Sequence, residues 1–128
     1  MKSYQLVAAN APLELVETET PEPQGTEVLV KVTACGVCHS DLHFWHGFYD
    51  LGDGTKMTLE DRNISLPFTM GHEPVGEVLS FGPDVDTDVK IGETRMIFPW
   101  TGCGDCARCD EGNEQDCANV APLGVRRP

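Results

Sequence analysis

A chain of 128 residues, 40% of them hydrophobic, is long enough for one core of ordinary size and too short for two full domains. With 21 Asp and Glu against 9 Lys and Arg, its formal charge of −12 argues against a nucleic-acid partner, because a phosphate backbone would be repelled. No apolar run approaches the ~20 residues that cross a bilayer, and 6 cysteines without a secretion signal indicate metal binding in the reducing cytoplasm.

The first quarter of the chain predicts short strands. Residues 4–9 and 13–19 are β-prone runs, joined by a turn at residues 10–12. Residues 27–33 alternate apolar and polar side chains, which predicts a half-buried strand with an inward face made of Val28, Val30 and Val32.

A brief helix is expected next. Ser40 or Asp41 can open it, and it should run to about Trp45 before Gly47 ends it. Residues 48–67 have the least periodic pattern and predict a long excursion. Such a loop is either functional or a solvated insertion, and the sequence does not favour one over the other.

The second half adds two strand candidates, residues 77–81 and 93–98, on either side of an Asp-rich, turn-like stretch at residues 82–92. Several short strands with frequent Gly and Pro predict a mainly β fold, a small barrel with little helix.

Four cysteines lie within residues 101–117 with the spacing C-x2-C-x2-C-x7-C, in a polar, acidic stretch with no apolar face to bury them. Four thiolates can close a tetrahedral shell around one zinc ion, so structural zinc is the favoured interpretation of Cys103, Cys106, Cys109 and Cys117. A disulfide pair is disfavoured without a secretion signal. An iron–sulfur cluster stays an alternative, although ferredoxin-like spacing continues with x3-C-P and the gap here is seven residues.

Cys38 and His72 form a second constellation, because both lie at expected strand-to-loop junctions beside glycines. Cysteine and histidine from separate segments are typical ligands of catalytic zinc, which keeps one position open. Asp41 or Glu73 could accept the other ring N–H of the histidine. Taken singly, His72 could be a surface polar group and Cys38 a buried thiol.

Three motifs together resemble the zinc-containing alcohol dehydrogenases of the medium-chain dehydrogenase/reductase superfamily. Residues 71–76 read G-H-E-P-V-G and are followed after five residues by G-P-D-V, which is similar to that family's zinc signature. Residues 36–43, G-V-C-H-S-D-L-H, resemble its first-ligand segment, and the four cysteines resemble its structural zinc loop. The resemblance covers essentially the whole chain and implies a GroES-like, partly open β-barrel with short helices and a zinc-binding lobe.

The resemblance also implies roles for individual residues. Cys38 and His72 would bind catalytic zinc, Glu73 could approach that ion, and Asp41 would orient the histidine. Ser40 would contact the alcohol and the nicotinamide ribose, His43 would pass a proton to solvent, and His39 would meet the cofactor pyrophosphate. The implied walls of the substrate pocket are Tyr49, Trp100 and Trp45.

The chain departs from this family in length and content. No G-x-G-x-x-G follows a strand, so the nucleotide-binding Rossmann domain is absent from this sequence, and no residue matches the third catalytic-zinc ligand. Residues 1–128 therefore resemble an incomplete N-terminal part of the catalytic domain. The chain alone is expected to bind zinc without turnover, while NAD or NADP is bound mainly by the rest of a dehydrogenase that forms a homo-oligomer when complete.

Two alternatives remain at this point. A non-catalytic, zinc-stabilised interaction module would explain the absent cofactor domain, although not the set Ser40, His43, Asp41 and Glu73. Within the family, the substrate could instead be a polyol, formaldehyde or a cinnamyl-type alcohol. The aromatic residues near the motifs favour an apolar alcohol slightly.

Overall fold

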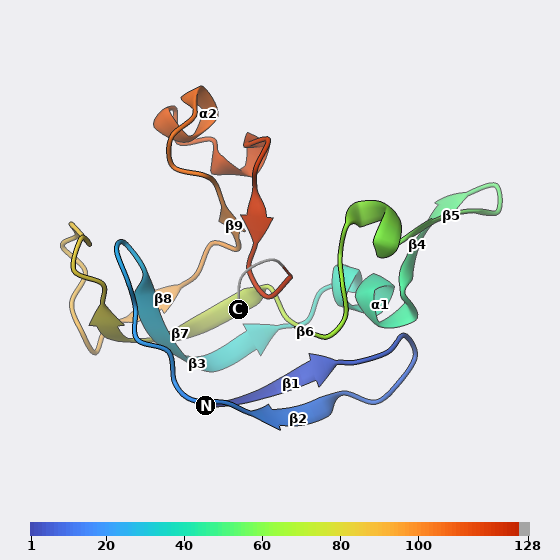
Figure 1. The fold of residues 1–128 in the computed structure, drawn as a ribbon, viewed down its shortest axis with the longest axis horizontal. Helices are drawn as coiled ribbons and strands as arrows, with labels where there is room; N and C mark the ends of the chain where they lie inside the picture. The colour runs from blue at the N-terminus through green and yellow to red at the C-terminus, as the bar shows by residue number, and fades with distance from the viewer. Residues whose placement is uncertain (126–128) are drawn as a thin grey trace.

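The computed structural model of this chain describes residues 1–125 and consists mainly of short strands (Figure 1). One antiparallel sheet has the order β2 (Glu14–Glu17), β1 (Lys2–Leu6), β6 (Phe68–Thr69). A second has the order β3 (Val28–Gly36), β7 (Glu73–Phe81), β8 (Thr94–Met96). Two strand pairs are β4 (Phe48–Gly52) with β5 (Thr55–Thr58), and β9 (Trp100–Thr101) with β10 (Ala121–Pro122).

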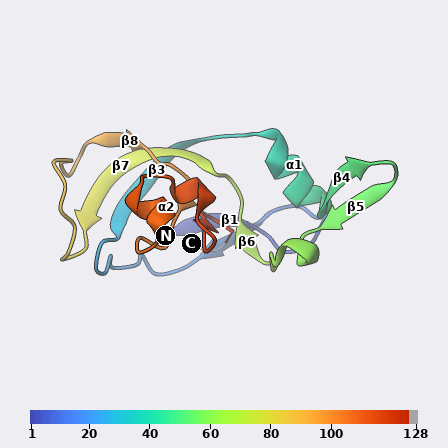
Figure 2. The same ribbon diagram turned by 90° about the horizontal axis from the view of Figure 1, so that it is seen from above.

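Helix is scarce in the described part of the chain. It comprises α1 (His39–His46), α2 (Ala107–Asp110) and the 3-10 turns η1 (Glu60–Arg62) and η2 (Glu114–Asp116). Figure 2 shows β3 and β7 curving together along one side of the molecule. The predicted mainly β, partly open architecture is confirmed, because residues 1–125 form separate sheets and no closed barrel. No helix among these residues is long and apolar enough to cross a membrane.

The antiparallel pairing of β3 with β7 brings two distant segments together. Gly36, the last residue of β3, lies opposite Glu73, the first residue of β7. Cys38 follows Gly36 by two residues and His72 directly precedes Glu73, so both leave the sheet at the same end. The strand at residues 77–81 was predicted correctly but is longer in the structure, because pairing with β3 extends it back to Glu73.

Helix α1 begins one residue before the earliest predicted start. Cys38 is its N-cap: the Cys38 thiol accepts a hydrogen bond from the Ser40 N–H, and Asp41 accepts one from the Cys38 N–H at 2.9 Å. Gly47 ends the helix, as predicted, with a left-handed φ of 83°. The chain therefore reverses at Gly47, and β4 contacts the helix it has just left.

The predicted excursion at residues 48–67 is instead largely ordered into a hairpin and a helical turn. Asp53 and its flanking glycines adopt positive φ angles, which suits the tight turn between β4 and β5. Thr58 and Asp61 form reciprocal hydrogen bonds across the start of η1: the Thr58 N–H donates to Asp61 at 2.8 Å and the Asp61 N–H donates to the Thr58 hydroxyl at 3.1 Å.

The core lies where the first sheet meets α1 and η1. Its buried members are Leu6, Phe44, Leu59, Ile64 and Phe68. The inward face predicted for β3 is only partly formed: Val30 is half-buried, but Val28 and Val32 are 43% and 56% exposed, although Val78 on the partner strand is buried. Alternation specifies which residues share a face, but burial requires a layer to cover that face.

We expect Leu6→Ala to lower the free energy of unfolding by about 2–5 kcal/mol, because Leu6 is completely buried and its loss leaves a cavity. Leu15→Ala is the matched control on the neighbouring strand, where Leu15 is 48% exposed, and should change stability by less than about 0.5 kcal/mol. Urea unfolding of the zinc-loaded chain measures both. Equal losses would contradict this location of the core.

Candidate metal centres

Four cysteine sulfurs converge in residues 101–117, the four-cysteine lobe, which stands away from the sheets in Figure 1. The sulfur–sulfur distances are 3.6 or 3.9 Å for the pairs Cys103–Cys109, Cys106–Cys109, Cys106–Cys117 and Cys103–Cys117. All four are free thiols. Sulfurs placed tetrahedrally at 2.3 Å from zinc are about 3.8 Å apart. The lobe therefore presents four ligand atoms at the spacing of a closed zinc site.

Short local structures hold these sulfurs in place. Cys106 is the N-cap of α2, and Cys109 lies within that helix. Cys117 follows η2 and is the most buried of the four, at 4% exposure. Gly102 is required for close packing, since a Cβ there would lie 2.4 Å from the Cys109 sulfur. The sequence places all four donors within seventeen residues, so a few tight turns suffice to bring them together.

The thiols of the lobe differ in acidity. Backbone N–H groups of Cys103 and Asn119 lower the pKa of Cys117 to about 7. The neighbouring Asp105 carboxyl is the main reason why the pKa of Cys103 rises to about 12. A cation held by all four sulfurs requires them as thiolates, so binding would release protons, chiefly from the less acidic thiols.

The second group of donors lies where β3 and β7 meet α1. The Cys38 sulfur is 2.9 Å from Nε2 of His72, and an oxygen of Glu73 lies within 4.8 Å of both. Ligands at 2.3 Å and 2.0–2.1 Å from a tetrahedral zinc ion would be about 3.5 Å apart. The pair would thus separate by roughly half an ångström to admit the ion. These are the two residues that the sequence predicted as ligands.

Asp41 lies behind the histidine. Its Oδ1 atom is 3.4 Å from Nδ1 of His72 and is the buried side-chain oxygen without a hydrogen-bond partner in residues 1–125. Asp41 is only 6% exposed, and its other oxygen accepts the Cys38 N–H. Protonated Nδ1 facing Asp41 leaves Nε2 free to bind a metal. The unsatisfied oxygen therefore fits a histidine that turns its Nε2 toward a cation.

Glu73 reaches this group because Gly36 has no side chain. A Cβ on Gly36 would lie 2.1 Å from Oε2 of Glu73. The Gly36–Glu73 pairing consequently allows the carboxylate to approach the Cys38 and His72 atoms. The predicted role of Glu73 near the ion is compatible with this placement and stays a prediction.

The predicted relay residues lie on α1. Ser40 and His43 are three residues apart and share one side of the helix. His43 is held between two rings: the centroid of His39 is 4.5 Å away at 72°, and that of Tyr49 is 4.5 Å away at 32°. Tyr49, predicted as a pocket wall, therefore contacts a predicted relay residue directly. Burial raises the pKa of its phenol, and Arg62 opposes this by its charge and a hydrogen bond.

The two tryptophans lie apart from these contacts. Trp45 packs against the core and its indole N–H donates to the Ala11 carbonyl at 2.8 Å, which ties α1 to the β1–β2 connection. Trp100 is 39% exposed on β9, at the base of the four-cysteine lobe. Their predicted pocket roles stay predictions.

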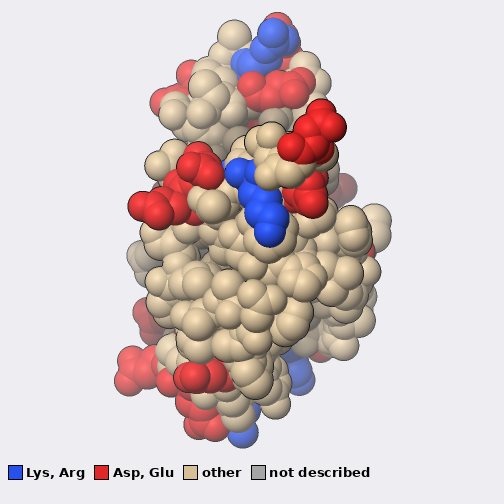
Figure 3. Space-filling model, turned by 90° about the vertical axis from the view of Figure 1, so that its right-hand side faces the viewer, with Lys and Arg blue, Asp and Glu red and all other residues tan. Residues whose placement is uncertain are grey.

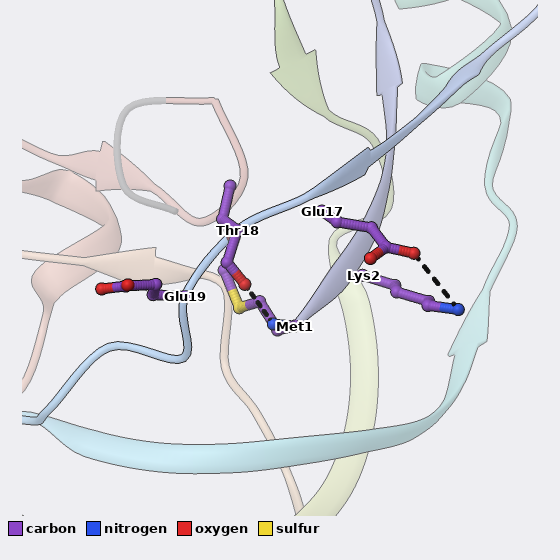
Figure 4. A pocket seen from close by; sticks show the side chains of 5 residues that line it. All are labelled: Met1, Lys2, Glu17, Thr18 and Glu19. Carbon is purple, nitrogen blue, oxygen red and sulfur yellow. Dashed lines mark hydrogen bonds and ion pairs between the residues drawn. The ribbon is translucent and has the colours of Figure 1, made fainter.

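Two surface hollows share no lining residue with either cysteine group. One, of about 450 Å³, is lined by Met1, Lys2, Glu17, Thr18 and Glu19 (Figure 4). There, Lys2 pairs with Glu17 at 3.3 Å. The other, of about 350 Å³, lies beside Gly47 and η1. Neither offers a cluster of metal-ligating or nucleophilic side chains.

Charge is distributed unevenly on the face seen from the right of Figure 1. Figure 3 shows a broad area without charged groups across its middle, with Asp and Glu gathered above and below and few Lys or Arg. This pattern agrees with the formal charge of −12.

Sequence reasoning missed Arg62. Its guanidinium, carried by η1, lies over the Tyr49 ring, 4.6 Å from the centroid, and Tyr49 in turn contacts His43. The signal that could have found it is T-L-E-D at residues 58–61, a capping pattern that predicts a helical turn within the supposed loop.

Comparison with known proteins agrees with the fold and the motifs. The family model described as "Alcohol dehydrogenase GroES-like domain" matches residues 24–126. The NAD-dependent alcohol dehydrogenase of Saccharolobus solfataricus is 38% identical over 125 residues, which is 98% of this chain and 35% of that protein. The L-galactonate-5-dehydrogenase of Escherichia coli is 28% identical over 129 residues, covering 99% of this chain and 34% of that protein.

Among solved structures, the alcohol dehydrogenase of Aeropyrum pernix superposes with a TM-score of 0.81 at 29% identity, covering 99% of this chain and 34% of that one. The chain thus spans about a third of the length of the curated relatives it matches. The matched region includes both cysteine groups and the segment 71–76. On these grounds the chain belongs to the alcohol dehydrogenase family, to whose GroES-like domain it corresponds.

Proposed function

We propose that these residues form the catalytic segment of a zinc-dependent alcohol dehydrogenase, which oxidises an alcohol to an aldehyde or ketone, or the reverse, with NAD or NADP. The observation that carries the proposal is the contact between Cys38 and His72, backed by the unsatisfied Asp41 oxygen. A non-catalytic, zinc-stabilised interaction module would need only the four-cysteine lobe and would not need the contact between Cys38 and His72.

The two groups of donors fit zinc in different ways. Four sulfurs with edges of 3.6 to 3.9 Å suit a closed, structural site held by Cys103, Cys106, Cys109 and Cys117. Cys38, His72 and the nearby Glu73 suit an open, catalytic site, because fewer than four strong donors leave room for substrate. Further ligation would come from outside these residues.

The residues of α1 would then handle the proton. Bound zinc would act as a Lewis acid on the alcohol oxygen. Ser40 would accept the hydroxyl proton of the alcohol and donate its own to His43, which would release a proton to solvent. Asp41 would keep Nδ1 of His72 protonated, and His39 would face the cofactor pyrophosphate. The nicotinamide would be held mainly by the rest of the enzyme.

The substrate is proposed to be a small alcohol, aldehyde or ketone. Tyr49 lies beside His43 of the proposed relay, and its ring could form an apolar wall of the substrate pocket while its hydroxyl adds a polar group. The whole enzyme is proposed to be a homo-oligomer with its own nucleotide-binding domain.

The direct test is Cys38→Ser in the complete enzyme. We expect alcohol-dependent reduction of NAD or NADP to fall by at least about a hundredfold, since even an outer partner of a metal ligand accounts for 10–100-fold. Thermal unfolding should change little, because an open site contributes less to folding than a closed one. An enzyme that retains its activity would contradict the proposal. One that simply unfolds would contradict the division between the two sites.

Asp41→Asn is expected to weaken zinc binding at the Cys38–His72 site by about 10–100-fold, because the amide no longer fixes the histidine as strongly. Competition with a chromophoric chelator measures this affinity in the complete enzyme. Asp50→Asn, at an exposed residue of β4, is the control and should leave the affinity unchanged. Unchanged affinity in Asp41→Asn would remove Asp41 from the site.

Cys103→Ser should remove most of the tightly held zinc and lower the unfolding temperature, since closed zinc sites contribute folding free energy outright. Cys35→Ser is the control: Cys35 is exposed and outside both donor groups, so its loss should cost within about 0.5 kcal/mol. Elemental analysis measures the zinc bound by each variant of the chain, and thermal unfolding measures its stability. Equal behaviour of the two variants would rule out a structural metal in the lobe.

A further inference from the structure

Two parallel arrangements of a cation, an aromatic ring and an imidazole link the β4–β5 hairpin region to α1. In one, Arg62 lies 4.6 Å from the Tyr49 centroid, and Tyr49 lies 4.5 Å from His43. In the other, Lys56 lies 3.8 Å from the Phe48 centroid, and Phe48 lies 6.1 Å from His46. Only the first ends on a residue of the proposed proton relay.

The stacked side chains of Arg62, Tyr49 and His43, here called the Arg62–Tyr49–His43 column, depend on η1, which the core holds in place. Leu59 and Ile64, on either side of η1, are 6% and 9% exposed and belong to the core. The Leu59 N–H donates to the Gly47 carbonyl at 3.2 Å, and the Arg62 N–H donates to the Leu59 carbonyl at 3.1 Å. The backbone that carries Arg62 is therefore fixed relative to the end of α1.

The column also defines the orientation of the imidazole. Tyr49 covers His43 at a 32° tilt, and His39 meets it at 72° from another side. A half-buried histidine near a helix end would otherwise sample several rotamers. The Arg62 guanidinium lies over the Tyr49 ring, so the restraint on His43 extends back to η1.

We propose that Arg62 is a positioning residue which, through Tyr49, holds the His43 imidazole in the orientation that the proton relay requires. This inference rests on the proposed function. Arg62 itself need not contact the substrate. Its part is to keep the proton acceptor in line with Ser40, because small displacements of a catalytic group are costly.

The experiment compares Arg62→Gln with Lys56→Gln in the complete enzyme. Diethyl pyrocarbonate modifies accessible histidines, and mass spectrometry follows the modification of His43 and His46 separately. We expect Arg62→Gln to accelerate modification of His43 by about threefold, the scale set by the loss of one cation–π contact. Lys56→Gln should affect His46 and leave His43 unchanged.

Steady-state kinetics provide the second measurement. Arg62→Gln should lower kcat about tenfold and leave KM for the alcohol within about twofold, because positioning and not binding is lost. Arg62→Lys keeps a cation that can lie over Tyr49 and should recover part of both effects. Lys56→Gln should retain the parental kcat.

Each result decides the matter. Accelerated modification of His43 with lower kcat in Arg62→Gln alone supports the inference. Unchanged reactivity of His43, equal effects in Arg62→Gln and Lys56→Gln, no recovery in Arg62→Lys, or a rise in KM alone would overturn it. If the parental enzyme oxidises no alcohol, the proposed function fails, and the modification rates still show whether Arg62 controls His43.

Discussion

The pairing of β3 with β7 is the constraint on which the Cys38–His72 site depends. Thirty-four positions separate these two residues in the sequence, and no local turn could bring them together. The register that sets Gly36 opposite Glu73 does so directly. The same pair also permits the approach of the Glu73 carboxylate, since Gly36 offers no Cβ in its way. A shift of this register by one residue would turn alternate side chains to the other face of the sheet and separate the donors.

The two donor groups illustrate two ways in which a fold can bring ligand atoms together. The four-cysteine lobe is local: its sulfurs come from one stretch of seventeen residues, folded by short turns. The Cys38–His72 group is non-local and depends on a sheet, on the capped start of α1 and on buried Asp41. This contrast agrees with the chemistry proposed for each. A closed local site can stabilise a lobe by itself, whereas an open site needs surroundings that hold its ligands without a full set of bonds.

The features that were predicted correctly from the sequence are those that depend on short-range patterns of residues. The mainly β architecture, the Gly47 end of α1 and the grouping of four cysteines all follow from residue types at fixed spacings. Prediction from the sequence failed where the burial of a side chain depends on residues from distant parts of the fold. Val28 and Val32 share a face as expected, but no described layer covers them.

The prediction of a long excursion at residues 48–67 was wrong for a related reason. The helical turn in this segment is stabilised by Leu59 and Ile64 entering a core that periodicity alone could not locate. The capping pattern at residues 58–61 indicates that turn, but the position of Arg62 over Tyr49 also depends on the reversal of the chain at Gly47, which that pattern does not specify. The pairing of Cys38 with His72 was suggested by their residue types and by resemblance, and the strand register supplies its physical basis.

X-ray absorption at the zinc edge of the complete enzyme would test the two-site account most directly. With one equivalent of zinc, the account predicts a shell of four sulfurs at about 2.3 Å. With two, it predicts a lower average sulfur number together with imidazole scattering that disappears in His72→Ala. A second equivalent that adds no imidazole signal would contradict the account.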